Sequence, residues 1–432
     1  MKTPSIAILI LVYGLVAYGR LDASETYYVD KGDSSCSDTV SAGSESNPWC
    51  SITYALSRMS GGDDLFVKSG TYNEFPLMQS HLTGTSDDVT KIQVHPGDNV
   101  TLKGIGVHTG RVKIDGVDYL TFDGFTITNY NQGLFVEGAS NHIVIQNLTI
   151  NFVGQEAIHV KENSNYITIQ NCTIHDTRQW SGSGSGNGEG MYIGTGSAGP
   201  KDNSSFIFIR DNLVYNTIHE GIELKPGTHD CIVERNHVYN VSTKHGAIEV
   251  GEPTLGEQHW GQNANHIIRD NIIHDTDTAM RLANGCLVYN NVIYDVNAGK
   301  YGIYIHNRSG DSYVRRIYHN TIDHDPSLSV YVRSGRHDVK NNIGSSMSDN
   351  IPLRSSFFVN TSEGNEDYHL KSGSAPIDGA VDLTGIVPFD LDGGARPAGS
   401  APDFGAYEFG AEGAGGSDRT PPNPPSNLRI IQ

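Results

Sequence analysis

The sequence predicts an all-β solenoid of short strands stacked as rungs, and three observations support this prediction. The first is a recurring five-residue motif: Asn, any residue, Val or Ile, Tyr or His, and then Asn or Asp. Its copies follow one another at intervals of roughly 20 to 35 residues, which is typical of repeats that each form one turn of a solenoid. The motif begins at Asn212, Asn236, Asn271 and Asn291, with a looser copy at Asn320 and a last fragment at Asn342. We expect these Asn side chains to point inward and to hydrogen-bond from rung to rung.

The second observation is a further short strand in each repeat, in which apolar residues alternate with variable ones. Residues 221–224 and 247–250 are examples, and most copies open with a small residue. Because side chains alternate across a strand, the apolar residues point inward and the middle residue points outward. The third observation is composition: 49 Gly and 18% charged residues suit a turn-rich β protein better than a helical one. A solenoid also accommodates 432 residues easily, because each repeat packs only on its neighbours.

The two ends of the chain differ from the repeats. Residues 1–23 combine a positive start, a short apolar run and small residues, which is typical of a secretory signal. That run is too short for a good membrane anchor, and no later run is long enough to span a bilayer. Residues 411–432 are rich in Gly and Pro and are predicted to form a flexible tail. We therefore expect one domain, residues 24–410, in a secreted or periplasmic monomer with no membrane attachment after signal removal.

Charge and cysteine content restrict the partners and the environment. The net charge of −19 argues against nucleic acid as a partner, and an anionic substrate would need local cations or a metal ion. Cys36 and Cys50 flank a polar loop and are predicted to form a disulfide in an exported chain. The other cysteines fall at inward positions of the repeats, where we expect core thiols and not metal ligands.

Two segments outside the repeats resemble a known group of proteins. Residues 25–75 read as a strand, an amphipathic helix, a Gly-Gly-Asp-Asp turn and a second strand followed by Gly-Thr-Tyr. Near the other end stand Ser-Ala-Pro-Ile-Asp-Gly at 374–379 and Pro-Asp-Phe-Gly-Ala-Tyr-Glu at 402–408. With the repeats, these segments resemble exported right-handed parallel β-helix proteins of the pectate-lyase-like superfamily. The resemblance implies a right-handed parallel β-helix with an N-terminal cap. It does not fix an activity, because the superfamily includes lyases, glycoside hydrolases, epimerases and adhesins.

Alignment of the repeats places three columns of residues side by side on one face. The first column is Phe135, His159, Tyr192, Glu223, Glu249, Arg281, Tyr304 and Tyr331. The second is Glu137, Lys161, Gly194, Lys225, Gly251, Ala283, His306 and Arg333. The third, just before the strand, is Glu156, Glu189 and Glu220, followed by Gly246 or His245. Carboxylates stacked about 4.8 Å apart repel one another, so this gathering of acidic, basic and aromatic groups favours a functional face over a solvated flank.

Three insertions interrupt the repeats beside this face, at residues 178–188, 195–204 and 252–263. Two of the three Trp residues of the chain lie in these insertions. Loops beside one strand face can form the walls of a cleft, and aromatic faces suit the apolar surfaces of sugar rings. The expected carbohydrate-binding residues are Lys161, Trp180, Tyr192, Trp260, Tyr304, His306 and Arg333.

The first functional hypothesis is a lyase that cleaves an acidic, uronic-acid-containing polysaccharide by β-elimination. The reaction requires neutralisation of the uronate carboxylate, a base for the adjacent C–H proton and an acid for the leaving oxygen. Lys225 is the predicted base, with His245 and Tyr192 as substitutes, and Arg281 is predicted to hold the substrate carboxylate. Ca²⁺ is the predicted cofactor, and its expected ligands are Glu189, Glu220, Glu223 and Glu249. The neighbouring Glu residues would raise the pKa of Lys225, so a neutral amine would require a bound cation.

Two alternatives stay open. A glycoside hydrolase needs two carboxylates, and Glu223 and Glu249 lie one rung apart, near the spacing of a retaining pair. Glu189 and Glu249 lie about two rungs apart, on the order of 9.6 Å, near the spacing of an inverting pair. A non-catalytic binding or adhesive solenoid would use the same columns only for contact. A separate outward column, Tyr215, Tyr239, His274 and Tyr294, carries no charge cluster, and we interpret it as structural stacking.

Overall fold

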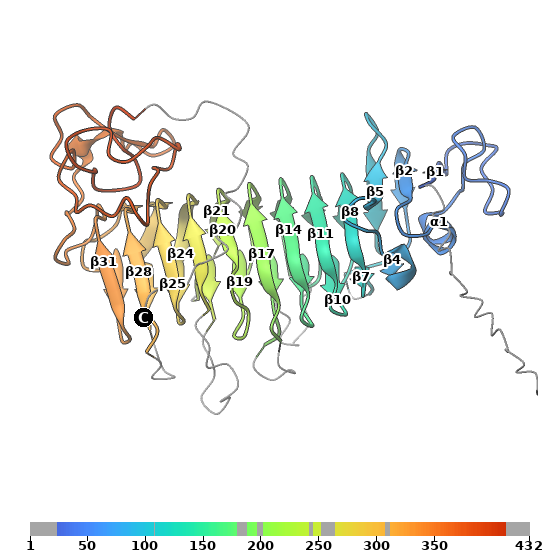
Figure 1. Cartoon of the computed structure of the whole chain (residues 1–432), viewed down its shortest axis with the longest axis horizontal. Coiled ribbons are helices and arrows are strands. Elements are labelled where there is room, and N and C mark those ends of the chain that lie inside the picture. Colours follow the sequence, from blue (N-terminus) through green and yellow to red (C-terminus); the bar gives the residue numbers. More distant parts are fainter. Residues whose placement is uncertain are drawn as a thin grey trace, which may run out of the picture.

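The computed structural model describes residues 24–107, 109–178, 188–196, 202–241, 245–251, 264–306 and 312–411. Short strands stack side by side along one long axis, with the N-terminal residues at one end and the C-terminal residues at the other (Figure 1). In the two large sheets that these residues form, neighbouring strands pair in parallel, for example β19 (Ile222–Leu224) with β22 (Ile248–Val250). The predicted parallel β-helix is therefore confirmed.

The strands form three ladders, one per side of each rung. The first ladder is a sheet of 12 strands: β1 (Thr26–Val29), β2 (Asp64–Val67), β5 (Thr90–Val94), β8 (Asp118–Asp123), β11 (Asn141–Gln146), β14 (Asn165–Gln170), β17 (Ser205–Arg210), β20 (Ile232–Glu234), β23 (His266–Arg269), β25 (Cys286–Tyr289), β28 (Arg315–Tyr318) and β31 (His337–Lys340). The second ladder contains β3 (Gly70–Tyr72), β6 (Val100–Lys103), β9 (Thr126–Thr128), β12 (Thr149–Asn151), β15 (Thr173–His175), β18 (Leu213–Tyr215), β21 (His237–Val241), β24 (Ile272–Leu282), β26 (Val292–Ile293) and β29 (Thr321–Ile322). The third contains β4 (Leu77–Gln79), β7 (Val112–Asp115), β10 (Leu134–Glu137), β13 (Ile158–Val160), β16 (Met191–Ile193), β19, β22, β24, β27 (Val296–Ile305) and β30 (Val330–Val332). Strand β24 belongs to the second and third ladders, which joins them into one sheet of 19 strands.

The interior combines apolar side chains with the predicted row of Asn residues. Inward residues such as Ile193, Leu224 and Val250 are almost fully buried. Each Asn side chain of the row donates from its Nδ2 to the Oδ1 of the next one, over 2.7 to 3.0 Å. The row runs through Asn212, Asn236, Asn271, Asn291, Asn320, Asn342 and Asn350. The predicted Asn ladder is confirmed, and Asn350 extends it by one step.

The last position of the repeated motif requires a special backbone conformation. In the four full copies this residue has a φ between 47° and 53°, in the left-handed region. Asn and Asp tolerate this region better than other residues with a side chain, because their short polar groups can hydrogen-bond locally. The four residues are Asn216, Asn240, Asp275 and Asp295. The motif therefore specifies both the buried ladder and the corner of the rung.

The aromatic column of the motif stacks ring on ring, as the sequence predicts. The centroids of Tyr215 and Tyr239 lie 5.0 Å apart, and those of Tyr239 and His274 lie 5.0 Å apart. Tyr294 follows at 4.7 Å from His274, and His175 extends the stack at 4.8 Å from Tyr215. Aromatic neighbours at this spacing stabilise adjacent rungs, so this column has a structural role.

An N-terminal cap covers the first rungs. Helix α1 (Ile52–Arg58) begins at Ser51, whose hydroxyl accepts a hydrogen bond from the backbone N–H of Tyr54 at 3.3 Å. The helix buries Ile52 and Leu56 against the core. A 3₁₀ turn, η1 (Ser80–Leu82), follows β4. A disulfide joins Cys36 to Cys50, and Cys172, Cys231 and Cys286 are buried free thiols.

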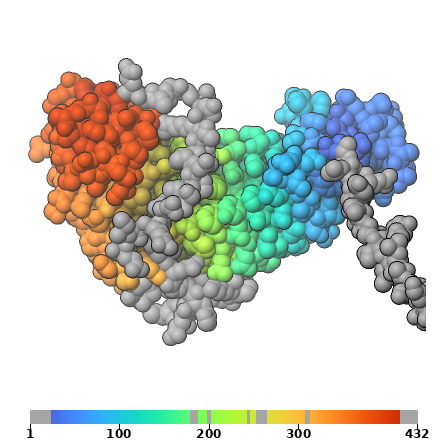
Figure 2. All heavy atoms as spheres, viewed as in Figure 1, coloured from blue at the N-terminus to red at the C-terminus, as the bar shows by residue number. Residues whose placement is uncertain are grey.

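A second, smaller core lies at the C-terminal end. The C-terminal residues, orange and red in Figure 2, gather at this end of the molecule. It includes η2 (Ser355–Phe357) and the antiparallel pair β32 (Phe358–Asn360) and β33 (Asp367–Leu370). Arg396 pairs with Glu408 at 2.7 Å, and both side chains are fully buried.

In the ranges that the structure describes, no helix has the length and hydropathy that a membrane crossing requires. Residues 1–23 and 412–432 lie outside those ranges, so the signal, the tail and the domain boundaries stay predictions.

Candidate functional site

The third ladder carries the outward column that the sequence predicts. Strand pairing aligns Phe135, His159, Tyr192, Glu223, Glu249, Arg281, Tyr304 and Tyr331 in one row. The register of the alignment is therefore confirmed. The middle of the row is crowded, because Tyr192 is 6% exposed and Glu223 and Glu249 are each 4% exposed. Its carboxylates lie in a largely dehydrated environment and not on an open flank.

Both carboxylates of this row, Glu223 and Glu249, are paired with cations. Glu223 contacts the ammonium of Lys225, which follows β19 on the same face. Arg281 of β24 donates to Glu249 Oε1 at 2.6 Å. The Nζ of Lys225 also lies over the ring of Tyr192, 4.3 Å from its centroid. The face thus presents an ammonium and a guanidinium two rungs apart, each balanced by a buried carboxylate.

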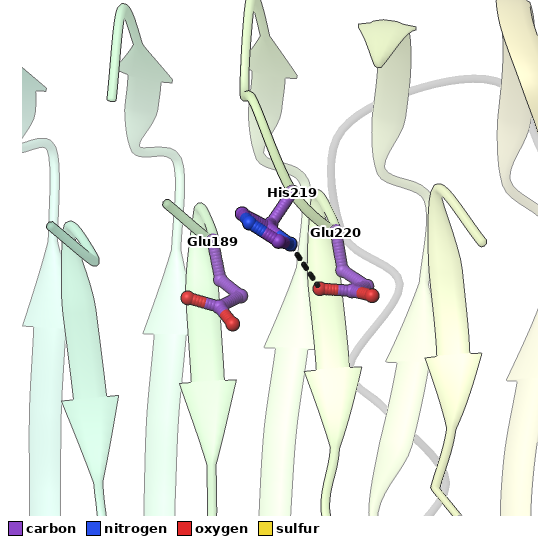
Figure 3. Close-up of side chains that lie close together, drawn as sticks. All are labelled: Glu189, His219 and Glu220. Atoms are coloured by element: carbon purple, nitrogen blue, oxygen red, sulfur yellow. Dashed lines mark ion pairs between the residues drawn. The ribbon is translucent and has the colours of Figure 1, made fainter. Parts of the chain in front are cut away.

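A second cluster lies in the turns that precede β16 and β19. Figure 3 shows His219 between the carboxylates of Glu189 and Glu220, which project from neighbouring rungs. The Nδ1 of His219 lies 3.9 Å from Glu220 Oε2. The other oxygen of Glu220, Oε1, lies 2.5 Å from Nδ1 of His245, and that nitrogen is 3.8 Å from Glu249 Oε2. Glu220 and His245 therefore connect the cluster to the ion pair of Glu249.

Burial and neighbouring charges move the pKa values of this cluster apart. Burial raises the pKa of Glu189 to about 7, and the nearby carboxylate of Glu220 adds to the effect. Burial opposes ionisation of Glu220 as well, but the hydrogen bond from His245 holds the pKa of Glu220 below its ordinary value. The same hydrogen bond raises the pKa of His245. The pKa of Glu189 is therefore raised and the pKa of Glu220 lowered, although the two carboxyl groups lie on adjacent rungs.

The charge of Lys225 is fixed by its surroundings. Burial alone would lower its pKa, but the carboxylate of Glu223 raises it above its ordinary value. Burial raises the pKa values of Glu223 and Glu249. Lys225 is therefore a cation at neutral pH in this arrangement, in line with the effect expected from its Glu neighbours. A role as base would require a compensating positive charge nearby.

The expected calcium ligands do not gather around one point. Among the described residues, the groups that could hold an ion are Glu189–His219–Glu220 and Glu220–His245–Glu249. Each group contains an imidazole, and Glu223 belongs to neither. Ca²⁺ binds about six to eight oxygen ligands, and imidazole suits transition metals instead. The donor set therefore fits calcium poorly, and the calcium site stays a prediction.

Comparisons with known proteins agree with the fold. A family profile described as "Right handed beta helix region" matches residues 110–314. This chain is a right-handed parallel β-helix protein. No curated protein matches it by sequence.

Several solved structures resemble this β-helix. An alginate lyase from Paenibacillus sp. str. FPU-7 is 18% identical with a TM-score of 0.55, covering 73% of this chain and 96% of that one. Pectate lyase Pel9A is 17% identical with a TM-score of 0.57, covering 89% and 96%. A rhamnogalacturonan lyase is 14% identical with a TM-score of 0.55, covering 79% and 92%. The likeness concerns the fold alone, and it agrees with the predicted right-handed parallel β-helix.

The N-terminal end of the face that carries the outward column contains cations that the alignment of the repeats missed. Lys161, an expected substrate-binding residue, pairs with Glu137 at 3.0 Å. Lys113 contacts the same carboxylate, and the guanidinium of Arg111 lies 4.2 Å from the ring centroid of Phe135. Strand β7, which contains Lys113, has no small residue at its start, so the repeat pattern did not reveal it. The register of Lys113 with Phe135 shows that it belongs to the column.

The C-terminal end of the face is aromatic. The ring of Tyr301, another residue that the alignment missed, lies 4.7 Å from Tyr331 and 4.9 Å from Tyr304. Arg333 lies 3.4 Å from the hydroxyl of Tyr304. His306 is only 1% exposed, which differs from the exposed position expected for a substrate-binding residue. The expected binding residues Trp180 and Trp260 lie outside the described residues.

Proposed function

We propose that this protein is a carbohydrate-active enzyme that cleaves a uronic-acid-containing polysaccharide by β-elimination. The observation that carries the proposal is the placement of Lys225, His245 and Arg281 on three successive rungs of one face. Lys225 directly follows β19, His245 precedes β22, and Arg281 lies in β24. An acidic polymer lying along the axis could contact all three side chains. The alginate, pectate and rhamnogalacturonan lyases that share the fold support this choice of reaction.

Each of the three side chains has a distinct role in this proposal. Arg281 binds the uronate carboxylate, since a guanidinium fork matches the two oxygens of a carboxylate. His245 accepts the proton from the carbon next to that carboxylate, while Glu220 holds its Nδ1. Lys225, kept protonated by Glu223, donates a proton to the leaving glycosidic oxygen. The C–H and C–O bonds break, a carbon–carbon double bond forms, and no other reactant is needed. The base is thus His245, one of the two substitutes named from the sequence, in place of Lys225.

Substrate carboxylates would compete with the buried Glu residues for the same cations. Glu249 now accepts the hydrogen bond of Arg281, and burial raises the pKa of Glu249. When a uronate replaces Glu249 as the partner of Arg281, protonation of Glu249 avoids an unpaired buried charge. The face can therefore exchange an internal ion pair for one with the substrate.

A glycoside hydrolase is the second candidate. Glu223 and Glu249 are direct register partners on adjacent strands, which is the arrangement that a carboxylate pair requires. Their ion pairs with Lys225 and Arg281 disfavour this role, because both carboxylates are already engaged. A non-catalytic binding solenoid is the third candidate.

One assay separates the three candidates. The purified protein is incubated with pectate, alginate, ulvan and glycosaminoglycans in separate reactions. Absorbance of the unsaturated uronate and the number of reducing ends are then followed together. A lyase produces both signals, a hydrolase produces reducing ends alone, and a binding protein produces neither. Reducing ends without the absorbance signal would replace our proposal with the hydrolase.

A further inference from the structure

We propose that Glu189, His219 and Glu220 form a binding site for a divalent transition-metal ion such as Zn²⁺ or Mn²⁺. One ligand atom from each side chain lies within 4.8 Å of the ligand atoms of the other two. Figure 3 shows the imidazole of His219 between Glu189 and Glu220, which project from neighbouring rungs. An ion with ligands at about 2.0 to 2.2 Å would draw these atoms closer together, which small side-chain rotations can achieve.

The state of Glu189 is the independent observation that points to a ligand. Its side chain is 3% exposed, and among the described residues its Oε2 has no hydrogen-bond partner. Glu156 occupies the same column one rung earlier, and its Oε2 also lacks a partner, but its Oε1 is contacted by His159 at 3.1 Å and by Gln132 at 2.8 Å. A buried carboxylate oxygen without a donor is costly, and a bound cation removes that cost.

The neighbours of the cluster orient its ligands. His245 contacts Oε1 of Glu220, while Oε2 of the same carboxylate faces His219. Such a contact from outside the ligand set is typical of metal sites, where it fixes the direction of a ligating carboxylate. Arg178 lies 3.4 Å from Nε2 of His219, on the opposite ring nitrogen. Binding through Nδ1 would place the proton of His219 on Nε2, so Arg178 must move away when the ion binds.

The donor types select the class of ion. One imidazole and two carboxylates match Zn²⁺, Mn²⁺ or Fe²⁺ better than Ca²⁺, which prefers an all-oxygen shell. Three protein ligands also leave coordination positions for water or a substrate oxygen. The inference does not rest on the proposed lyase activity, because the metal alone can be titrated without any polysaccharide.

The test is a metal titration of the full chain, after treatment with a chelator and dialysis. Zn²⁺, Mn²⁺ and Ca²⁺ are titrated separately by isothermal titration calorimetry. We expect one equivalent of Zn²⁺ or Mn²⁺ to bind at least about 10-fold more tightly than Ca²⁺. Glu189→Gln and His219→Ala should each weaken that binding by more than about 10-fold, since even outer contacts of a metal site contribute this much. Glu156→Gln is the matched control and should leave the affinity unchanged.

A spectroscopic measurement adds a second readout, which does not depend on the measured affinity. Co²⁺ bound in the site should give visible absorption bands that are lost in His219→Ala. The side chain of His219 is 34% exposed, so this variant should fold even if Glu189→Gln does not, and circular dichroism verifies both. Equal affinity for Ca²⁺ and Zn²⁺ would overturn the proposal. Unchanged transition-metal binding in a folded His219→Ala protein would overturn it as well.

Discussion

Gly194 lies directly against Lys225: a Cβ at position 194 would lie 3.0 Å from the Cβ of Lys225, and 2.6 Å from Cγ2 of Thr228 beside it. The φ of Gly194 is +94°, which also disfavours any side chain. We therefore expect Gly194→Ala to displace Lys225 and to lower turnover by about 10-fold or more, as small misplacements of catalytic groups do. Steady-state kinetics on the preferred polysaccharide measures the effect.

Gly299 provides the control for that substitution. Its φ is +75°, but a Cβ there would meet no atom within 4 Å. Gly299→Ala should therefore carry a similar backbone strain without moving a neighbour, and its turnover should match the wild-type value. Equal kinetics for the Gly194 and Gly299 variants would contradict the idea that Gly194 positions Lys225.

The Asn ladder predicts that replacing a ladder Asn lowers the free energy of unfolding much more than replacing an exposed Asn. The side chain of Asn271 donates to Asn291, to Val233 O and to Arg269 O. Its Oδ1 accepts from the side chain of Asn236. Asn271→Ala leaves several buried groups without partners, so we expect a loss of at least about 2 kcal/mol in the free energy of unfolding.

Urea unfolding followed by circular dichroism measures that loss. The control is Asn297→Ala, since Asn297 is exposed and, within the described ranges, its side chain hydrogen-bonds only to Asp277, at 2.8 Å. This variant should unfold within about 0.5 kcal/mol of the wild type. A similar midpoint for both variants would show that the ladder does not stabilise the rungs.

His369 should make the C-terminal end of the protein sensitive to alkaline pH. It donates to Asp392 at 2.7 Å and to Asp367 at 2.6 Å, and these hydrogen bonds, above all the one to Asp392, raise its pKa to about 9. The folded pKa exceeds the unfolded value of about 6.5, so the stabilisation is complete below pH 6.5 and disappears as the pH rises through 9. We expect His369→Gln to lower Tm at pH 6 but not at pH 10. The size of the effect will be modest, because His369 is half exposed and solvent screens the pairs.

Repeated patterns explain which features the sequence revealed. The Asn ladder and the outward column follow from alternation along a strand, which fixes the direction of each side chain. Alternation carries no information on crowding, so the burial of His306 could not be read from it. The sequence placed several Glu residues near Lys225, but it did not single out Glu223 as the partner, because ion pairs depend on side-chain conformation within one face.

Two other differences between the sequence-based prediction and the structure have local causes. Residues 272–282 appear in the sequence as a motif followed by a separate short strand, but they form the single long strand β24. Asp275 has a φ of 49° and the pairing with β27 shifts register between Thr276 and Thr278, so the chain turns the corner of the rung here while its ladder pairing continues. His219 received no role from the sequence, although it directly precedes Glu220. Its position became meaningful only when the register placed Glu189 on the neighbouring rung.

Lys225 tests the assignment of proton transfer. Lys225→Ala should lower kcat by about 100-fold or more, because it removes the proton donor of the leaving oxygen. It should also lower Tm, since Glu223 is then buried without its cation. Adding Glu223→Gln should restore Tm but not kcat.

Lys300→Ala is the control for that series, because Lys300 is 42% exposed and pairs with Asp277 at 3.6 Å on the surface. Its activity and Tm should equal those of the wild type. If Lys225→Ala keeps full activity while Glu223→Ala or Glu249→Ala loses it, the hydrolase becomes the better description.

Arg281 tests recognition of the uronate. Arg281→Lys keeps the positive charge but loses the planar fork, so we expect KM to rise by about 10-fold with a smaller change in kcat. Arg281→Ala would leave Glu249 buried without its partner, and the double variant with Glu249→Gln removes that complication. Arg316→Lys, in β28 on a different ladder, should leave KM unchanged. An unchanged KM in Arg281→Lys would mean that another cation binds the substrate carboxylate, and Lys161 and Lys113 would be the next residues to substitute.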